Sequence, residues 1–180
     1  QRLKAFASIN PMFGKEAISE IERCVSLGFC GIGELGPGAN GFDFQSPQFL
    51  DVLECAVHYH LPVCIHCGEP IGHTYPGKDT TSLAPIPQLL KTYPNLKLIL
   101  AHMGGGLPFY EMNPRYKELF QNVRYDTAAN PLLYDIKSIK TVISMVGPNR
   151  LLYGSDFPLL LYPSVKREMD FSLFIHDITQ

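Results

Sequence analysis

Short apolar runs alternate with amphipathic segments along most of the chain. The runs have the length of buried strands, and apolar residues recur at helical spacing between them, as they do from Lys15 to Leu27. The expected strands are Leu3–Ile9, Phe29–Leu35, Pro62–His66, Leu96–Ala101, Val123–Asp126 and Leu151–Tyr153. The expected helices are Lys15–Leu27, Ser46–His60, Pro85–Tyr93, Tyr110–Gln121 and Asp135–Val146, followed by an amphipathic segment at Ser164–Ile178. This alternation predicts a parallel sheet with right-handed crossovers.

The predicted fold class is α/β, of the (β/α)8 TIM-barrel type. A complete barrel has eight strand–helix units and about 250 residues, whereas this chain of 180 residues supplies about six units. We therefore expect residues 1–180 to form a single, partial barrel domain. Unpaired strand edges favour pairing with another chain, so a homo-oligomer is expected as well.

Four of the apolar runs end in side chains that bind metals. Gly31–Glu34 ends in a carboxylate, the next two such runs end in His66 and His102, and the last is followed by Asp156. The carboxyl ends of barrel strands are where such folds build catalytic sites. Imidazole and carboxylate ligands suit zinc and manganese. The sequence therefore predicts a divalent metal at Glu34, His66, His102 and Asp156, with zinc as the leading candidate and manganese as the alternative.

A metal ion at this place would activate water. A bound divalent cation lowers the pKa of water from 15.7 toward about 7 and polarises the bond under attack. Asp156 is predicted to be a ligand and the base that moves the proton, and Glu34 is placed to bridge a second ion. One or two ions are therefore expected.

A long polar loop follows the predicted strand that ends at His66. Residues 68–82 are rich in Gly, Pro and Thr, and a loop of this length inside a compact domain suggests a role in substrate binding. His73, Tyr75 and Lys78 are the candidate side chains for a substrate carboxylate or phosphate, although an ordinary polar loop would look the same. Asp126, at the end of its strand, is a candidate partner for a metal-bound histidine.

Three other motifs carry less weight. The G-x-G-x-x-G pattern at 31–36 is followed by Pro37 and not by a helix that would hold a pyrophosphate. Cys64 and Cys67 are three apart on a strand and face opposite sides, so they are not expected to chelate together. The H-x-H pair at 58–60 lies on a helical pattern, where residues two apart do not share a face.

Composition excludes some classes of protein. The chain is 46% hydrophobic and 18% charged with a net charge of -2, and its basic residues form no stripe, which argues against nucleic acid as a partner. No apolar run approaches the roughly 20 residues that span a bilayer. A small-molecule substrate and a cytoplasmic location are expected, with the five cysteines reduced.

Three stretches of the chain resemble the amidohydrolase superfamily, in particular its amidohydrolase-related branch of hydrolases and non-oxidative aromatic-acid decarboxylases. They are residues 61–68 (LPVCIHCG), 95–105 (NLKLILAHMGG) and 147–158 (GPNRLLYGSDFP). The segment 33–36 (GELG) is also similar to the strand-end glutamate of the superfamily's metal-dependent deoxyribonuclease branch.

The resemblance implies roles for individual residues. It makes His66 a metal ligand, His102 a ligand or catalytic group, and Asp156 both ligand and base; in the deoxyribonuclease branch the residue matching Glu34 bridges two metals. The family also carries an H-x-H pair on its first strand, and nothing before Leu3 supplies one. The chain is therefore expected to be truncated at its N-terminus.

The leading functional hypothesis is a metal-dependent hydrolase that uses metal-activated water on an amide, ester or lactone bond of a small molecule. The first alternative is a non-oxidative decarboxylase of an aromatic or small carboxylic acid with the same metal site. A phosphodiesterase would rest on Glu34 and is disfavoured by the scarcity of basic residues. An inactive barrel fragment that acts as an oligomerising piece is the alternative outside enzymes.

Overall fold

The computed structural model describes residues 3–75, 77–165 and 167–179. Pro76, in the expected substrate loop, and Lys166, in the expected C-terminal segment, lie outside the described residues. The helices and strands, with η for a 3-10 helix, are η1 (Pro11–Phe13), α1 (Lys15–Ser26), β1 (Ile32–Leu35), α2 (Pro37–Asn40), α3 (Pro47–His58), β2 (Pro62–Ile65), α4 (Ile86–Thr92), β3 (Lys97–Leu100), η2 (His102–Met112), α5 (Pro114–Lys117), β4 (Val123–Asp126), α6 (Asn130–Leu133), α7 (Lys137–Val146), η3 (Pro148–Arg150), β5 (Leu151–Leu152) and α8 (Ser172–Thr179).

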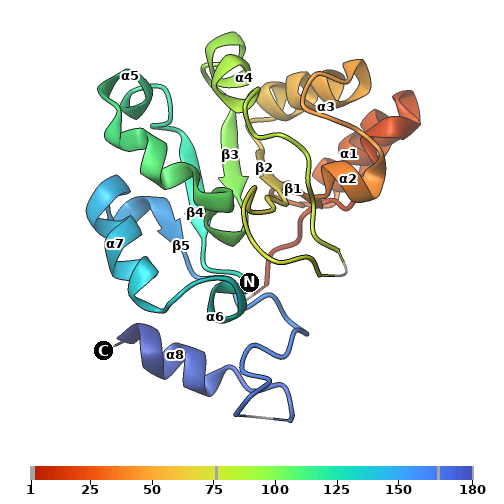
Figure 1. Cartoon of the computed structure of the whole chain (residues 1–180). Helices are drawn as coiled ribbons and strands as arrows, with labels where there is room; N and C mark the ends of the chain where they lie inside the picture. The colour runs from red at the N-terminus through yellow and green to blue at the C-terminus, as the bar shows by residue number, and fades with distance from the viewer. Residues whose placement is uncertain (1–2, 76, 166, 180) are drawn as a thin grey trace.

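The five strands form one parallel sheet in the order β1-β2-β3-β4-β5, which confirms the predicted α/β class. Figure 1 shows the strands side by side, with α1, α3, α4, α5 and α7 arranged around them. The middle strands pair in step, with Val63 opposite Leu98 and Leu98 opposite Val123. Because parallel strands in register end at the same edge of the sheet, residues that follow β1 to β4 are brought together there.

The first predicted strand is reduced to a single bridge. Ala7 pairs with Ile32 in parallel, and its N–H donates to the carbonyl of Gly31 at 2.8 Å while its carbonyl accepts from Gly33 N at 2.9 Å. The N-terminal segment thus lies along β1 in the place predicted for the first strand. Asn10-Pro11 then begins η1, which ends the extended run.

Two further local predictions need correction. The segment after the glycine pattern at 31–36, where no helix was expected, contains the short helix α2, which begins at Pro37 as proline at a first helical position allows. The helix predicted over Tyr110–Gln121 is replaced by the end of η2 and the four-residue α5. Asn113 between them is extended, with φ -77° and ψ 118°, and Pro114 after it cannot continue a helix and begins a new one.

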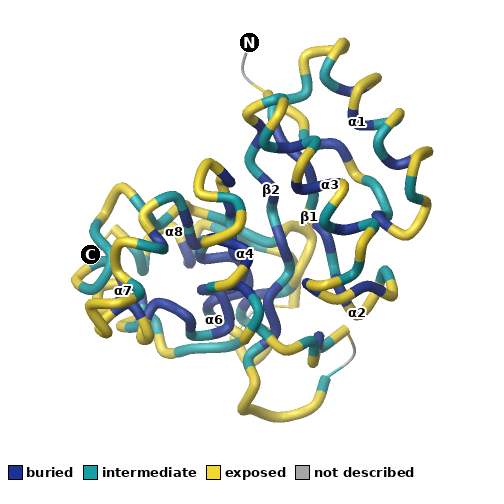
Figure 2. The backbone as a smooth tube through the Cα atoms, turned by 90° about the horizontal axis from the view of Figure 1, so that it is seen from above, coloured by how far each residue is buried: buried dark blue, intermediate teal, exposed yellow. Residues whose placement is uncertain are grey.

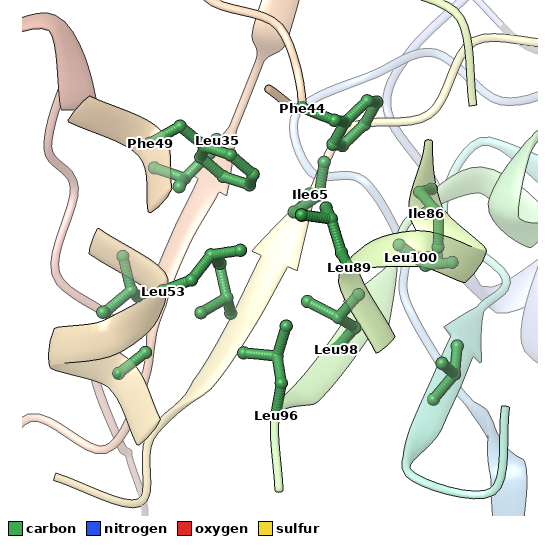
Figure 3. Close-up of a cluster of buried hydrophobic side chains, with 14 of the residues drawn as sticks. Leu35, Phe44, Phe49, Leu53, Ile65, Ile86, Leu89, Leu96, Leu98 and Leu100 are labelled. Atoms are coloured by element: carbon green, nitrogen blue, oxygen red, sulfur yellow. The ribbon is translucent and has the colours of Figure 1, made fainter. Parts of the chain in front are cut away.

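The hydrophobic core lies between the sheet and the surrounding helices. Alternate strand residues, among them Val63, Ile65, Leu98 and Leu100, are buried and pack together with side chains from α3 and α4 (Figure 3). Figure 2 shows the helices with buried and exposed positions alternating along their length, as amphipathic helices on a sheet require. The other set of strand residues, which includes Cys64, is only half-buried and faces the interior side of the partial barrel.

No helix within residues 3–75, 77–165 and 167–179 has the length and apolar character needed to cross a bilayer.

A buried ion pair ties the second half of the fold together. Glu111 on η2 accepts hydrogen bonds from Tyr125 Oη at 2.6 Å and from two guanidinium nitrogens of Arg150 at 2.5 and 2.6 Å. The Nε of Arg150 also donates to the carbonyl of Val123 at 2.9 Å. Glu111 is only 4% exposed, so its charge depends on these partners. The carboxylate joins η2, β4 and η3, directly before β5.

Glu111→Gln is expected to lower the free energy of unfolding by about 3 kcal/mol, because it leaves the Arg150 charge without its buried counter-ion. Urea denaturation followed by circular dichroism measures this. Glu118→Gln, an equivalent change at an exposed position, is the control and should stay within about 0.5 kcal/mol of the parent protein. Equal stabilities of the two variants would contradict the role given to the ion pair.

Candidate metal centre

Three side chains from three adjacent strand ends converge on one point. Nδ1 of His66, directly after β2, lies 2.8 Å from Oε1 of Glu34 on β1 and 3.0 Å from Nε2 of His102, which follows β3. The distance from His102 Nε2 to the same carboxylate oxygen is 3.4 Å. One atom from each residue thus forms a compact set of two nitrogens and one oxygen.

A close approach of two backbones directs Glu34 toward this point. Gly33 has a φ of 119°, and a Cβ at this position would lie 2.4 Å from the carbonyl oxygen of Cys64. Only glycine allows β1 to come this near to β2. The residue that follows, Glu34, is thereby placed beside His66.

A half-buried carboxylate, that of Asp126, holds the backbone that carries His102. His102 has a φ of 57°, a conformation that non-glycine residues adopt only when their surroundings enforce it. Oδ1 of Asp126 accepts the N–H of His102 at 2.9 Å and that of Ala128 at 3.0 Å. The sequence suggested Asp126 as a partner of a metal-bound histidine; the structure shows that it binds the main chain of His102 and not the ring.

The ring of His102 is oriented by a carbonyl. Its Nδ1 lies 3.1 Å from the carbonyl oxygen of Ala128, so Nδ1 carries a proton and donates, and Nε2 is the nitrogen that faces Glu34 and His66. A histidine fixed through its other nitrogen in this way is the usual arrangement of a metal ligand. The two nitrogens and the carboxylate oxygen therefore fit a divalent transition metal.

The charges of Glu34 and His102 shift each other's pKa values. Burial opposes the ionised form of Glu34, but hydrogen bonds from His102 and His66 outweigh it and lower its pKa to about 2. Burial likewise opposes the charged form of His102, but the Glu34 carboxylate, the Ala128 carbonyl and Asp156 raise its pKa to about 9. In the metal-free protein His102 thus holds a proton on the nitrogen that a metal would occupy.

Asp156 lies on the other side of the His102 ring. Its Oδ2 is 3.9 Å from Nδ1 of His102, and its side chain is 27% exposed. Burial raises the pKa of this carboxyl although His102 favours its charged form. The structure therefore brings Asp156 to the site but outside the converging set of donor atoms. Its predicted roles as ligand and base stay predictions.

The three candidate substrate residues of the loop after β2 bind one another and Glu69. Oη of Tyr75 donates to Glu69 at 3.1 Å, and Nζ of Lys78 lies 3.3 Å from Glu69 and donates to the carbonyl of His73 at 3.1 Å. The Lys78 and Glu69 side chains are only 10% and 12% exposed. This cluster holds the loop in shape, and substrate binding by His73, Tyr75 and Lys78 stays a prediction.

Sequence reasoning missed Asp79, which joins the loops after β1 and β2. Its carboxylate accepts from Gly38 N at 2.8 Å and from Thr81 N at 2.7 Å. An aspartate that binds the amide two residues on is a recognisable turn signal, but nothing local points to Gly38. The Ala128 carbonyl was likewise beyond reach, because only the fold brings it to His102.

Of the motifs given little weight, the cysteine pair and the H-x-H pair contribute no atom to the converging set, and the glycine pattern contributes Glu34 alone. The five cysteines are all free, and Sγ of Cys67, which is fully buried, donates to the carbonyl of Ile65 at 3.5 Å. Burial raises the pKa values of both Cys64 and Cys67, so neither thiol is prepared to bind metal as a thiolate. Pro37 begins a helix of only four residues, which leaves the glycine pattern at 31–36 without a nucleotide-binding helix.

A family model described as amidohydrolase matches residues 1–171. The chain belongs to the amidohydrolase family. Among its relatives, 2-amino-3-carboxymuconate-6-semialdehyde decarboxylase of Dictyostelium discoideum is 25% identical, with 89% of this chain aligned. Gamma-resorcylate decarboxylase of Rhizobium radiobacter is 26% identical over 87% of the chain. A 2-keto-4-carboxy-3-hexenedioate hydratase of a Sphingobium strain is 28% identical over 78% of the chain.

The solved structures of the amidohydrolase family share this fold. The manganese-bound 5-carboxyvanillate decarboxylase of Novosphingobium aromaticivorans superposes with a TM-score of 0.62 at 18% identity, and the match covers 87% of this chain and 55% of that one. The match covers 52%, 60% and 47% of the Dictyostelium, Rhizobium and Sphingobium relatives, respectively. The chain thus spans about half of its relatives' length, and the prediction of a partial (β/α)8-type barrel is confirmed.

Replacing Asp126 by Ala is expected to weaken binding of Zn²⁺ by about 10- to 100-fold, because the amide of His102 loses the carboxylate that fixes the ring's position. Titration of the metal-free protein with Zn²⁺ by calorimetry measures the affinity. The control is Asp51→Ala, at an exposed position of α3. An affinity unchanged by Asp126→Ala would show that the backbone of His102 needs no such support.

Affinity for Zn²⁺ is also expected to fall as the pH is lowered from 9 to 7. The metal must displace the proton that His102 holds with a pKa of about 9, and each pH unit below that value makes the displacement about tenfold harder. His102→Gln removes the titrating group and should flatten the dependence over this range. A steep slope retained in that variant would place the competing proton elsewhere.

Proposed function

We propose that this chain carries the metal site of a non-oxidative decarboxylase acting on a small aromatic carboxylic acid. The observation that carries the proposal is the convergence of Glu34, His66 and His102 at the strand ends, with Asp156 beside them. Two of the sequence relatives described above are decarboxylases of unsaturated or aromatic acids. They favour this function over the hydrolase that the sequence alone suggested.

A divalent ion would be held by Nδ1 of His66, Nε2 of His102 and Oε1 of Glu34. It would supply the positive charge that binds a substrate carboxylate or hydroxyl and lowers the energy of the negative charge that develops. Zinc and manganese both suit these ligands, and a structural relative holds manganese. Zinc as the resident metal, a cytoplasmic location and self-association remain predictions.

Asp156 is the residue that we propose moves the proton. Because burial raises its pKa, its carboxyl can hold a proton and deliver it to the ring carbon that bears the substrate carboxylate. The bond from that carbon to the carboxylate then breaks, its electron pair restores the aromatic ring, and carbon dioxide leaves. Asp156 is left as a carboxylate, whose charge His102 stabilises from 3.9 Å.

A hydratase is the second function with specific support, because one relative carries that activity. Hydration also needs a proton donor beside a metal-bound group, so the same residues would serve it. The names of this hydratase and of gamma-resorcylate decarboxylase both indicate a carboxylic acid as the substrate. The two reactions differ in whether carbon dioxide is released.

The test is release of carbon dioxide from 2,6-dihydroxybenzoate by the purified chain, with Zn²⁺ or Mn²⁺ added and after removal of metal by a chelator. Asp156→Asn is expected to lower the rate by at least about 100-fold, the usual contribution of a positioned proton donor. Asp51→Asn is the control. Lactone or ester hydrolysis without carbon dioxide release would restore the hydrolase hypothesis, and undiminished turnover by Asp156→Asn would contradict the role of this residue.

A further inference from the structure

A cavity of about 400 Å³ lies between the loop after β2 and the segment that runs from η2 to α5. We call it the side cavity. Its apolar lining comes from the loop, from α4, from η2 and from the residues around α5. The main apolar side chains are Leu83, Pro87, Leu107, Tyr110, Tyr116 and Phe120. The volume is within the range of small-molecule pockets, about 300 to 1,000 Å³.

The side cavity is separate from the metal centre. Glu34, His66, His102 and Asp156 are not among the residues that line it. Its wall toward the centre includes Gly68 and Gly105, which lie in direct contact: a Cβ on Gly105 would be 2.6 Å from the carbonyl oxygen of Gly68. These glycines follow His66 and His102 by two and three positions in the sequence. A molecule in the side cavity would therefore touch the backs of both histidine-bearing segments.

The lining selects against anions. Among the residues that the structure describes, no lysine, arginine or histidine lines the cavity, and Asp79 is the one charged residue of the lining. Burial opposes the ionised form of Asp79, but hydrogen bonds from Thr81 and Gly38 lower its pKa, so the carboxylate is negative near neutral pH. Both of its oxygens already accept backbone N–H groups. A carboxylate or phosphate ligand would meet repulsion and no cation to offset it.

The lining favours a neutral ring with a hydroxyl group. Tyr110, Tyr116 and Phe120 offer aromatic surface for a ring. Thr80 and Ser82, at the exposed rim, offer hydroxyl groups that can bind a ligand O–H. The rim also opens the cavity to solvent, so a ligand can enter without unfolding the loop.

We propose that the side cavity is a second binding site, specific for an uncharged phenol-sized molecule. It is independent of the reaction assigned to the metal centre, because its ligand touches none of the metal-binding side chains.

The test is to titrate the metal-free chain with phenol and, separately, with benzoate. Saturation-transfer NMR measures the binding of each ligand. Phenol is expected to bind with saturation below about 5 mM, consistent with the affinity of so few atoms, and benzoate at least about tenfold more weakly. Equal binding of the two, or no saturable phenol binding, would overturn the proposal.

Two variants place the phenol in the side cavity. Leu107→Trp fills the cavity from its wall, and Ala84→Trp fills it from the exposed rim, where folding is least affected. Each should weaken phenol binding at least about tenfold. The control, Gln88→Trp, puts the same ring on an exposed position of α4 outside the lining and should leave binding unchanged. Phenol binding that survives Ala84→Trp in a folded protein would place the ligand elsewhere and refute the site.

Discussion

The parallel pairing of β1 to β4, which is in step from β2 to β4, is the constraint on which the rest of the structure depends. Val63, Leu98 and Val123 stand level across three strands, so the residues that follow each strand emerge at the same edge. The close approach at Gly33 then brings β1 within contact of β2. The convergence of Glu34, His66 and His102 follows from strand register and needs no long loop to gather the ligands.

Much of this arrangement could be predicted from the sequence. An apolar run predicts a buried strand, and the histidine at its end, His66 or His102, is then predicted to lie at the end of that strand. Both predictions are possible because the run and the histidine are adjacent in the chain. The α/β class followed from the same alternation. The helix expected over Tyr110–Gln121 failed for a physical reason. Asn113 is extended before Pro114, which interrupts the helix, and the buried carboxylate of Glu111 binds Tyr125 of β4 and Arg150.

The supporting contacts of the site were harder to predict because they are made between residues far apart in sequence. The Ala128 carbonyl that orients His102 is 26 positions away, and the Gly38 amide that binds Asp79 is 41 positions away. Asp126 was recognised as a partner but its target was not, since a carboxylate at a strand end can bind either a ring or a main-chain amide. Local patterns identify which residues carry chemistry; the fold decides which atoms they present.

The four residues of the site differ in how firmly the fold holds them. Glu34, His66 and His102 are on, or within two positions of, four-residue strands of the sheet, and the His102 backbone is held by Asp126 as well. Asp156 is four positions beyond a strand of only two residues, in a loop, and is still partly exposed. A metal ligand must be held rigidly, whereas a proton donor must be open to the substrate within hydrogen-bond distance. The difference in support therefore favours Asp156 as the proton carrier and the other three residues as the metal ligands.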